Sequence, residues 1–432
     1  MRTWPTLVVW ALTRALVVYW LLSPEHAARG DIFYYQHSLD ALGENGVQGT
    51  LAEYPVPAFV LLAVPYLILD LVHFTIAYPV VIVSAAILTD LFFLRFLVGS
   101  RRWRPDQPAW MRITAAEWMW LLAAPALGAT TYARFDLIPG VLVGLALLYA
   151  VQRPGLAACF GAMATGVKYW PAIVLPTLAA PAETRRKTIT AGTIAGLVIG
   201  VISLIIGGWS RIISPLQYQG TRGLQIESIF ASPAMARWVS NPHDYTVFFA
   251  SSKAYEVTGP SVGFLLHLSS IATVVLAFTL VGLWSWAWLR LKDPEQSIDV
   301  LVWLVLASVT GFIVTSKVFS PQYLLWVLPG AAAGLVVLRG HRSWNHLAGW
   351  SMVLLAATLM THEIFPRNYN ALTVHAADSN AIVALLVTRN TIIAGLCVAA
   401  AGEAAWLLWR MRPPRAVAPA QAAHEAAVPA ER

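Results

Sequence analysis

Carboxylates gather in one short stretch that follows the first hydrophobic segment of a chain that is otherwise apolar and basic. Residues 23–55 contain five acidic residues and a single basic one. Asp31 is the most suggestive acid, because the aromatic residues Tyr34 and Tyr35 follow it closely. Glu53 closes the stretch. A positioned carboxylate can accept the proton of an attacking hydroxyl group. Asp31 could instead simply cap a helix, since aspartate is a favoured N-cap residue.

Polar and charged residues also recur in the later loops. An ionisable group at a membrane edge is costly unless it is paired or hydrated, which makes each of these residues a functional candidate. The pair His362 and Glu363 could also be no more than a solvated turn. The further candidates are Arg134, Asp136, Lys168, Arg222, Gln225, Glu227, Lys317, Gln322, Tyr323 and His362.

One carboxylate with several cations favours the transfer of a sugar from a lipid phosphate. The leaving phosphate is a stable anion, so it needs cations rather than a general acid. The acceptor hydroxyl group must lose a proton as it attacks the anomeric carbon, so it needs one base. A single displacement of this kind inverts the anomeric centre. It requires no metal and no cofactor, and the sequence has no paired aspartates or His/Cys ligand spacing.

The cations also have structural interpretations that the sequence leaves open. Lys168 could extend its ammonium group to the membrane surface and do nothing more. Arg222 could pair with Glu227. Lys317 and Gln322 could be a helix-end cation and a helix cap.

Composition places these residues in a membrane protein. The chain is 58% hydrophobic and 12% charged, with a mean hydropathy of +0.63, whereas soluble domains average about 25% charged residues. The net charge of +7 needs no nucleic acid, because Lys and Arg gather beside hydrophobic spans as membrane topology requires. Cys159 and Cys397 lie within apolar runs and predict no disulfide framework.

The first spans fix the expected orientation. Residues 5–22 are long for a signal peptide and predict a retained anchor, which puts the Asp31 loop outside. Residues 56–72 and 77–98 would then return the chain to the outside, but the basic cluster that follows should be cytoplasmic. Either one stretch is a partial or tilted helix or the cluster breaks the rule. The cluster consists of Arg101, Arg102, Arg104 and Arg112.

The remaining charges are consistent with one bundle of about 11 to 13 helices over residues 1–411. Residues 155–180 are too short for two crossings, so they predict a broken hairpin with Lys168 at its outer apex. The Ala- and Pro-rich residues 412–432 predict a disordered cytoplasmic tail. The other expected spans are residues 114–130, 137–151, 188–207, 263–289, 300–315, 324–338, 346–361 and 381–409, with a long external loop before residue 262.

The order of several short motifs resembles glycosyltransferase family 87. The resemblance implies an all-α, GT-C-type multi-helix membrane fold, an extracytoplasmic active site and a base aspartate, matched by Asp31. That family includes actinobacterial mannosyltransferases of phosphatidylinositol mannoside synthesis, which use polyprenol-phosphate-mannose, and related arabinosyltransferases. Two motifs depart from the family pattern, Tyr54-Pro-Val-Pro57 and Ala133–Asp136. The matching motifs are Gly30-Asp31, Tyr34, Tyr54-Pro55, Lys168 to Pro171, Arg222 to Ser228 and Lys317 to Tyr323.

We therefore expect an inverting glycosyltransferase of the plasma membrane, acting on an extracytoplasmic glycolipid or polysaccharide acceptor. The donor would be a polyprenyl-phosphate sugar, with mannose as the expected sugar and Asp31 as the base. A flippase or transporter of lipid-linked sugars is the alternative, in which the same charges line a pathway. The expected donor contacts are Lys168, Arg222, Lys317, Gln322 and Tyr323, and the acceptor or sugar contacts Tyr34, Tyr35, Glu53, Arg134, Asp136, Gln225, Glu227 and His362.

Overall fold

The computed structural model describes residues 3–72, 77–99 and 113–411. The arginine cluster at residues 101–112 and the predicted tail at residues 412–432 lie outside these ranges. Within them the chain is almost entirely helical, which confirms the predicted all-α class. The one sheet in the described ranges is an antiparallel hairpin of β1 (Thr246–Phe249) and β2 (Tyr255–Thr258).

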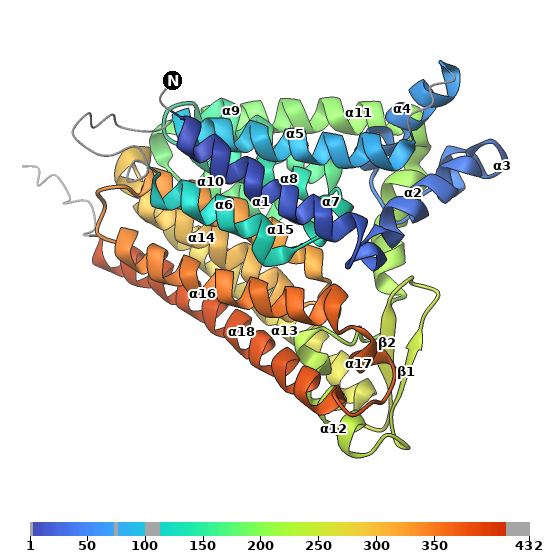
Figure 1. The fold of residues 1–432 in the computed structure, drawn as a ribbon. Coiled ribbons are helices and arrows are strands. Elements are labelled where there is room, and N and C mark those ends of the chain that lie inside the picture. The colour runs from blue at the N-terminus through green and yellow to red at the C-terminus, as the bar shows by residue number, and fades with distance from the viewer. Residues whose placement is uncertain (1–2, 73–76, 100–112, 412–432) are drawn as a thin grey trace, which may run out of the picture.

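Seven helices are long and apolar enough to cross a membrane, so the chain is a multi-pass membrane protein. Four shorter apolar helices pack among them, which brings the set to the lower end of the prediction (Figure 1). The long spans are α1 (Trp4–Leu22), α5 (Tyr78–Gly99), α11 (Ala182–Gly220), α13 (Val262–Arg290), α14 (Pro294–Thr315), α16 (Trp344–His362) and α18 (Ser379–Arg410). The shorter ones are α4 (Val56–Leu71), α8 (Leu137–Tyr149), α9 (Pro154–Val167) and α15 (Leu324–Val337).

Short elements connect these helices at both ends of the bundle. They are the helices α2 (Gly30–Asp40), α3 (Leu42–Gly49), α7 (Thr130–Ala133), α10 (Leu175–Leu178), α12 (Ser232–Ser240) and α17 (Asn370–Thr373). Helix α6 (Ala115–Leu127), in the expected span 114–130, is also short but packs inside the bundle against α1, α15 and α16. The 3-10 helices are η1 (His26–Arg29), η3 (Trp170–Val174), η4 (Ile229–Ala231) and η5 (Pro321–Tyr323), and η6 (Glu363–Arg367) is a π-helical turn.

The two ends of the bundle differ in character. Helices α2, α3, α12 and α17 and the hairpin lie together at one end, which we call the polar end (Figure 1). We call the opposite end the basic end, since the helix ends and loops there carry Arg153, Arg185, Arg290 and Arg339. A cation-rich end of this kind is typical of the cytoplasmic side of a membrane protein.

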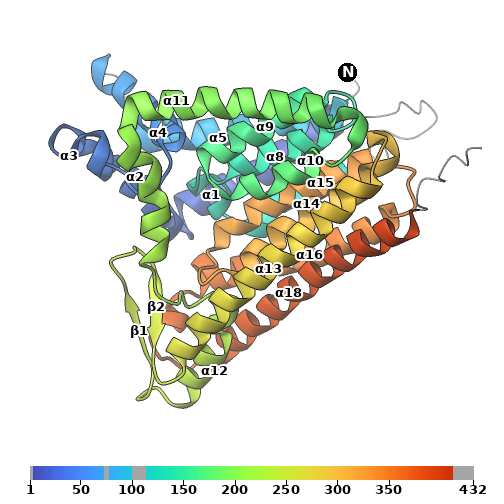
Figure 2. The same ribbon diagram turned by 180° about the vertical axis from the view of Figure 1, so that it is seen from behind.

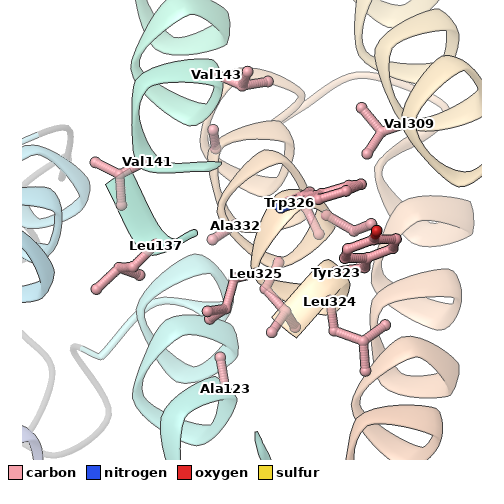
Figure 3. Close-up of a cluster of buried hydrophobic side chains, with 14 of the residues drawn as sticks. Ala123, Leu137, Val141, Val143, Val309, Tyr323, Leu324, Leu325, Trp326 and Ala332 are labelled. Carbon is pink, nitrogen blue, oxygen red and sulfur yellow. The ribbon is translucent and has the colours of Figure 1, made fainter. Parts of the chain in front are cut away.

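The centre of the bundle is formed by α8, α14 and α15. In the apolar stretch of α14, 78% of the residues are buried, whereas in the apolar stretch of α11 only 6% of them are. A helix that is apolar all round and buried belongs to the core, and one that is apolar and exposed faces lipid. Figure 3 shows the core side chains meeting between α8 and α15, with Tyr323 and Trp326 beside each other at the start of α15. The buried core thus holds the elements of the polar end in position.

Helix α4 resolves the conflict in the predicted topology. It has 16 residues with Pro65 inside. It starts and ends at the polar end, next to α2 and α11 (Figure 1). Helix α5 alone then carries the chain to the basic end. The structure therefore favours the alternative in which one of the two stretches is a partial helix.

The predicted broken hairpin is confirmed. Helix α9 ends at Val167, and Lys168 adopts an extended conformation with φ −152° and ψ 135°. The chain then returns through η3 and α10. Pro171 starts η3, where its missing N–H group costs no hydrogen bond. Lys168 therefore lies at the apex that the segment lengths predicted.

Helix α11 bends sharply at Gly208, and its second half runs across the polar end (Figure 2). Gly208 has φ +69° and ψ 179°, a conformation that glycine adopts without the steric cost of a side chain. Just after the bend, the buried Arg211 ties α11 to the end of the Asp31 stretch. Its guanidinium donates to the carbonyl oxygens of Val47, Thr50, Leu51 and Tyr54.

Candidate active site

Asp31 and Arg134 form an ion pair at the polar end. Asp31 lies in the first turn of α2 and Arg134 directly follows α7. The side chains are 24% and 19% exposed, so both can be reached from solvent. The cap position of α2 is Arg29, and no side chain caps the helix there. The capping role that the sequence left open for Asp31 is therefore wrong.

Asp136 and Lys168 form a second ion pair. The Lys168 Nζ atom lies 2.5 Å from Asp136 Oδ1, and the Trp326 indole N–H donates to the same oxygen at 2.7 Å. The ammonium group also lies over the rings of Phe135, Tyr323 and Trp326, at 5.3, 5.9 and 5.1 Å from their centroids. Carboxylate and aromatic rings together hold the cation in one place.

Burial and charge act against each other in these two pairs. Burial raises the pKa of the Asp31 carboxyl group, and the Arg134 guanidinium opposes that rise. Burial lowers the pKa of the Lys168 ammonium group, and Asp136 opposes that fall. A carboxylate with a raised pKa is a better proton acceptor. The charge of Asp136, another of the predicted site residues, also raises the pKa of Asp31.

Arg222 and Lys317 lie on neighbouring loops of the polar end. Lys317 Nζ donates to the carbonyl oxygen of Gly220 at 3.0 Å. Burial, and next the charge of Arg222, lowers the pKa of Lys317. Arg222 also acts on the pKa of Lys168, and among the described residues its buried Nε atom has no hydrogen-bond partner. Because these cations act on one another electrostatically, an anion bound between them would stabilise all of them.

Glu227 pairs with Arg389 of α18, and not with Arg222. The two side chains are fully buried, with Arg389 Nη2 3.5 Å from Glu227 Oε2 and 3.2 Å from the Glu227 carbonyl oxygen. Burial raises the pKa of Glu227 to about 7, against the effect of Arg389. Gln225, also buried, accepts a hydrogen bond from the Phe319 N–H at 3.1 Å. Glu227 thus connects its loop to α18, and Gln225 connects the same loop to the segment at Phe319. The side chains of Gln225, Glu227 and Arg389 do not face solvent.

The aromatic candidates of α2 have different surroundings. Tyr34 donates to Glu53 Oε1 at 2.7 Å, and both side chains are partly exposed. Tyr35 is buried and packs edge-on against Tyr54, with 6.0 Å between ring centroids. Tyr34 and Glu53 are therefore accessible to a substrate, whereas Tyr35 belongs to the core.

Three further candidates lie at helix ends. Gln322 and Tyr323 are 6% and 7% exposed, and the Tyr323 ring stacks on Trp326 at 3.8 Å. His362 is buried at the end of α16, with its Nε2 atom 2.6 Å from Oε1 of Glu25. His362 is 2% exposed. The solvated turn that the sequence allowed for His362 and Glu363 is therefore wrong for His362.

The sequence interpretation missed Glu25, Trp326 and Arg389. A signal existed for Arg389, since it is a lone cation inside the long apolar stretch 381–409, and such residues are functional or paired by default. For Glu25 and Trp326 nothing local in the sequence marks the partners that the fold supplies.

Two other features lie apart from these residues. A cavity of about 1390 Å³ opens at the basic end, with Arg95, Gln152, Arg339 and His341 in its wall. None of the candidate residues lines it, so it does not belong to this site. Across the described ranges, no group of three or more His, Cys, Asp or Glu side chains could hold a metal ion.

A helical bundle with seven helices long and apolar enough to cross a membrane, and with ion-paired polar side chains gathered at one end, defines a multi-pass membrane protein. The family model of glycosyltransferase family 87 matches residues 53–321. The chain therefore belongs to glycosyltransferase family 87 and is a membrane glycosyltransferase. The match includes Arg134, Asp136 and Lys168, and Asp31 precedes it. No curated protein matches the chain.

Proposed function

We propose that this protein is an inverting glycosyltransferase that takes a sugar, with mannose as the expected one, from a polyprenyl-phosphate donor. The acceptor would be an extracytoplasmic glycolipid or polysaccharide. The observation that carries the proposal is the Asp31–Arg134 pair beside the Asp136–Lys168 pair, partly open to solvent at the polar end. A base and a phosphate-binding cation would then share one site.

In the proposed reaction, Asp31 accepts the proton of the acceptor hydroxyl group. The acceptor oxygen forms a bond to the anomeric carbon on the face opposite the phosphate. The bond from that carbon to the phosphate oxygen breaks, and the oxygen keeps the electron pair. The phosphate thus leaves as an anion, and the sugar is inverted by this single displacement.

The cations have the complementary task. The charge on the departing phosphate grows as the bond breaks, so cations that are already in place stabilise the transition state. Lys168 is held over three aromatic rings, and Arg222 and Lys317 act on each other electrostatically. We assign these three side chains to the donor phosphate. Tyr34 and Glu53 are the accessible groups for the acceptor or the sugar.

The test is transfer by purified protein in lipid nanodiscs, with a panel of polyprenyl-phosphate sugars. The Asp31→Asn variant should lose roughly 100- to 10,000-fold in kcat, the usual contribution of a general base. Glu44→Gln, an exposed carboxylate of the same stretch, is the matched control and should keep the wild-type rate. A folded Asp31→Asn variant that transfers at the wild-type rate removes the base assignment.

Reconstituted vesicles distinguish the enzyme from a transporter. A transporter moves the lipid-linked sugar across the bilayer without consuming it, whereas the proposed enzyme releases polyprenyl phosphate. Movement of the donor with no release of polyprenyl phosphate would reject the enzyme. The Lys168→Ala variant should bind the donor more weakly, and an unchanged affinity would remove its phosphate contact.

A further inference from the structure

Glu25 is a buried carboxylate outside the proposed reaction centre. It lies between α1 and η1 and is 3% exposed. A buried charge is strongly unfavourable unless it is paired and hydrogen-bonded. Glu25 meets that need with three partners. Its Oε2 accepts from the backbone N–H of Ala129 at 3.0 Å, and its Oε1 lies 2.6 Å from His362 Nε2 and 3.0 Å from Arg367 Nε.

These contacts join both partners of the proposed base pair to one carboxylate. Asp31 follows Glu25 by six residues, through η1 and the first turn of α2. Arg134 follows Ala129 by five residues, through α7. The Asp31–Arg134 ion pair and the Ala129–Glu25 hydrogen bond thus close a ring with two short helical segments between them. In a ring this short, moving Glu25 or Ala129 must move the ion pair.

The third side of the arrangement is the end of α16. Gly128, next to Ala129, has φ +67°, and a Cβ atom there would lie 2.0 Å from His362 Nε2. Only glycine therefore allows His362 to reach Glu25 at this turn. The Arg367 guanidinium lies over the ring of Trp20, at 5.1 Å from its centroid. The end of α16 thus fastens Glu25 to the bundle.

We propose that Glu25 is a positioning residue that holds Asp31 against Arg134 in the geometry needed for proton transfer. This inference depends on the proposed role of Asp31 as the base. Glu25 is 3% exposed, so its role is to position other residues rather than to meet a substrate. Although burial raises its pKa, hydrogen bonds from His362 and Ala129 hold the pKa of Glu25 below its usual value, so the carboxylate stays charged.

The first test separates turnover from binding. In Glu25→Ala, kcat should fall roughly 10- to 100-fold, the effect of displacing a reacting group by about 1 Å. The KM for the donor should stay within about twofold, because the phosphate-binding cations belong to other elements. Glu25→Gln should keep more activity, because its amide oxygen still accepts from Ala129. Glu363→Ala is the matched control, since it breaks the exposed pair with Arg367 and leaves Glu25 in place.

The second test does not need the reaction. In a chain with Cys159→Ala and Cys397→Ala, the substitutions Asp31→Cys and Arg134→Cys replace both partners of the ion pair by thiols. A short bifunctional thiol reagent should link them in high yield, and adding Glu25→Ala should reduce the yield several-fold. If Glu25→Ala does not fold, Glu25→Gln is measured in its place, with an intermediate yield expected.

The outcomes separate the two proposals. An active Asp31→Asn variant overturns the base assignment, whereas the thiol cross-link still reports whether Glu25 fixes the ring. Unchanged cross-linking and unchanged kcat in the folded Glu25 variants overturn the positioning role alone. A fall in kcat with an equal fall in the folded fraction also overturns it, because Glu25 would then serve only stability.

Discussion

At the level of single residues, the balance between burial and charge at Asp31 has a measurable consequence. Burial raises the pKa of Asp31 and Arg134 opposes this. The proposed base is active only when it is deprotonated, so activity should fall as the pH drops through this pKa.

Removing the guanidinium in Arg134→Gln should raise the pKa of Asp31 further, because the opposing charge is lost. The acidic limb of the kcat/KM profile should therefore move to higher pH. Transfer assays across the pH range measure this. Arg237→Gln removes an exposed cation of α12 at the same end and should leave the limb in place. A limb that does not move in Arg134→Gln would assign the titration to another group.

Lys168 gives the opposite limb. A phosphate-binding lysine must be protonated, and burial already lowers the pKa of Lys168 while Asp136 opposes this. Asp136→Asn removes the opposing charge, so the pKa should fall further and the alkaline limb of kcat/KM should move to lower pH. Lys168→Arg keeps its charge throughout this range, so it should abolish the limb if it folds. An alkaline limb that is identical in all three proteins would contradict the assignment.

At the level of elements, the bend of α11 depends on one glycine. Gly208 has φ +69°, and a side chain there costs about 1–3 kcal/mol. Gly208→Ala should therefore lower the unfolding temperature and loosen the segment that carries Arg211. Gly196→Ala is the matched control in the same helix, because no atom lies within 4 Å of its added Cβ. Thermal unfolding in nanodiscs measures both, and equal unfolding temperatures would show that the bend tolerates a side chain.

A buried cluster of polar side chains joins α1, α5 and α7 inside the bundle. Arg14 makes a two-pronged contact with Asp90, at 2.7 and 2.9 Å, and the Tyr132 hydroxyl group donates to Asp90 at 2.6 Å. All three side chains are buried. The cluster fixes α7, which leads to Arg134.

Asp90→Asn should be strongly destabilising, because it leaves the Arg14 guanidinium buried without a counter-charge. A loss of about 3–5 kcal/mol is expected for one broken partner of a buried pair. Tyr132→Phe removes a single hydrogen bond and should cost about 1 kcal/mol. Denaturant unfolding of the purified variants gives both values. Equal losses in the two variants would mean that the charge on Asp90 does not matter.

The elements that the sequence predicts well are those whose signal is local. Segment lengths and Pro171 predicted the broken hairpin at Lys168, and hydropathy located the spans. Helix α4 stayed ambiguous, because its length alone does not show whether it crosses the bundle or starts and ends at the same end. The expected span 188–207 ended directly before the bend at Gly208, but a loop was expected after it. The structure instead continues the helix to Gly220, because the polar residues after the bend pack onto the Asp31 stretch through Arg211.

At the level of the whole molecule, the site depends on contacts between segments far apart in the sequence. Glu227 and Arg389 meet across 162 residues, and Glu25 and His362 across 337. A one-dimensional pattern contains no information on such pairings, although it marks the residues as unusual. The sequence therefore marked Glu227 and His362 as candidates, but it did not give their partners Arg389 and Glu25, because only the fold selects them.

The charge difference between the two ends makes a prediction about orientation. From the bias of Lys and Arg toward cytoplasmic loops we expect the basic end in the cytoplasm, and Asp31 and the hairpin outside. In a chain with Cys159→Ala and Cys397→Ala, Ser251→Cys in the hairpin should react with a membrane-impermeant thiol reagent on intact cells. Arg342→Cys at the basic end should react only after permeabilisation, and its exposure matches that of Ser251. The reverse result would place Asp31 in the cytoplasm, and an extracytoplasmic acceptor could then no longer reach the proposed base.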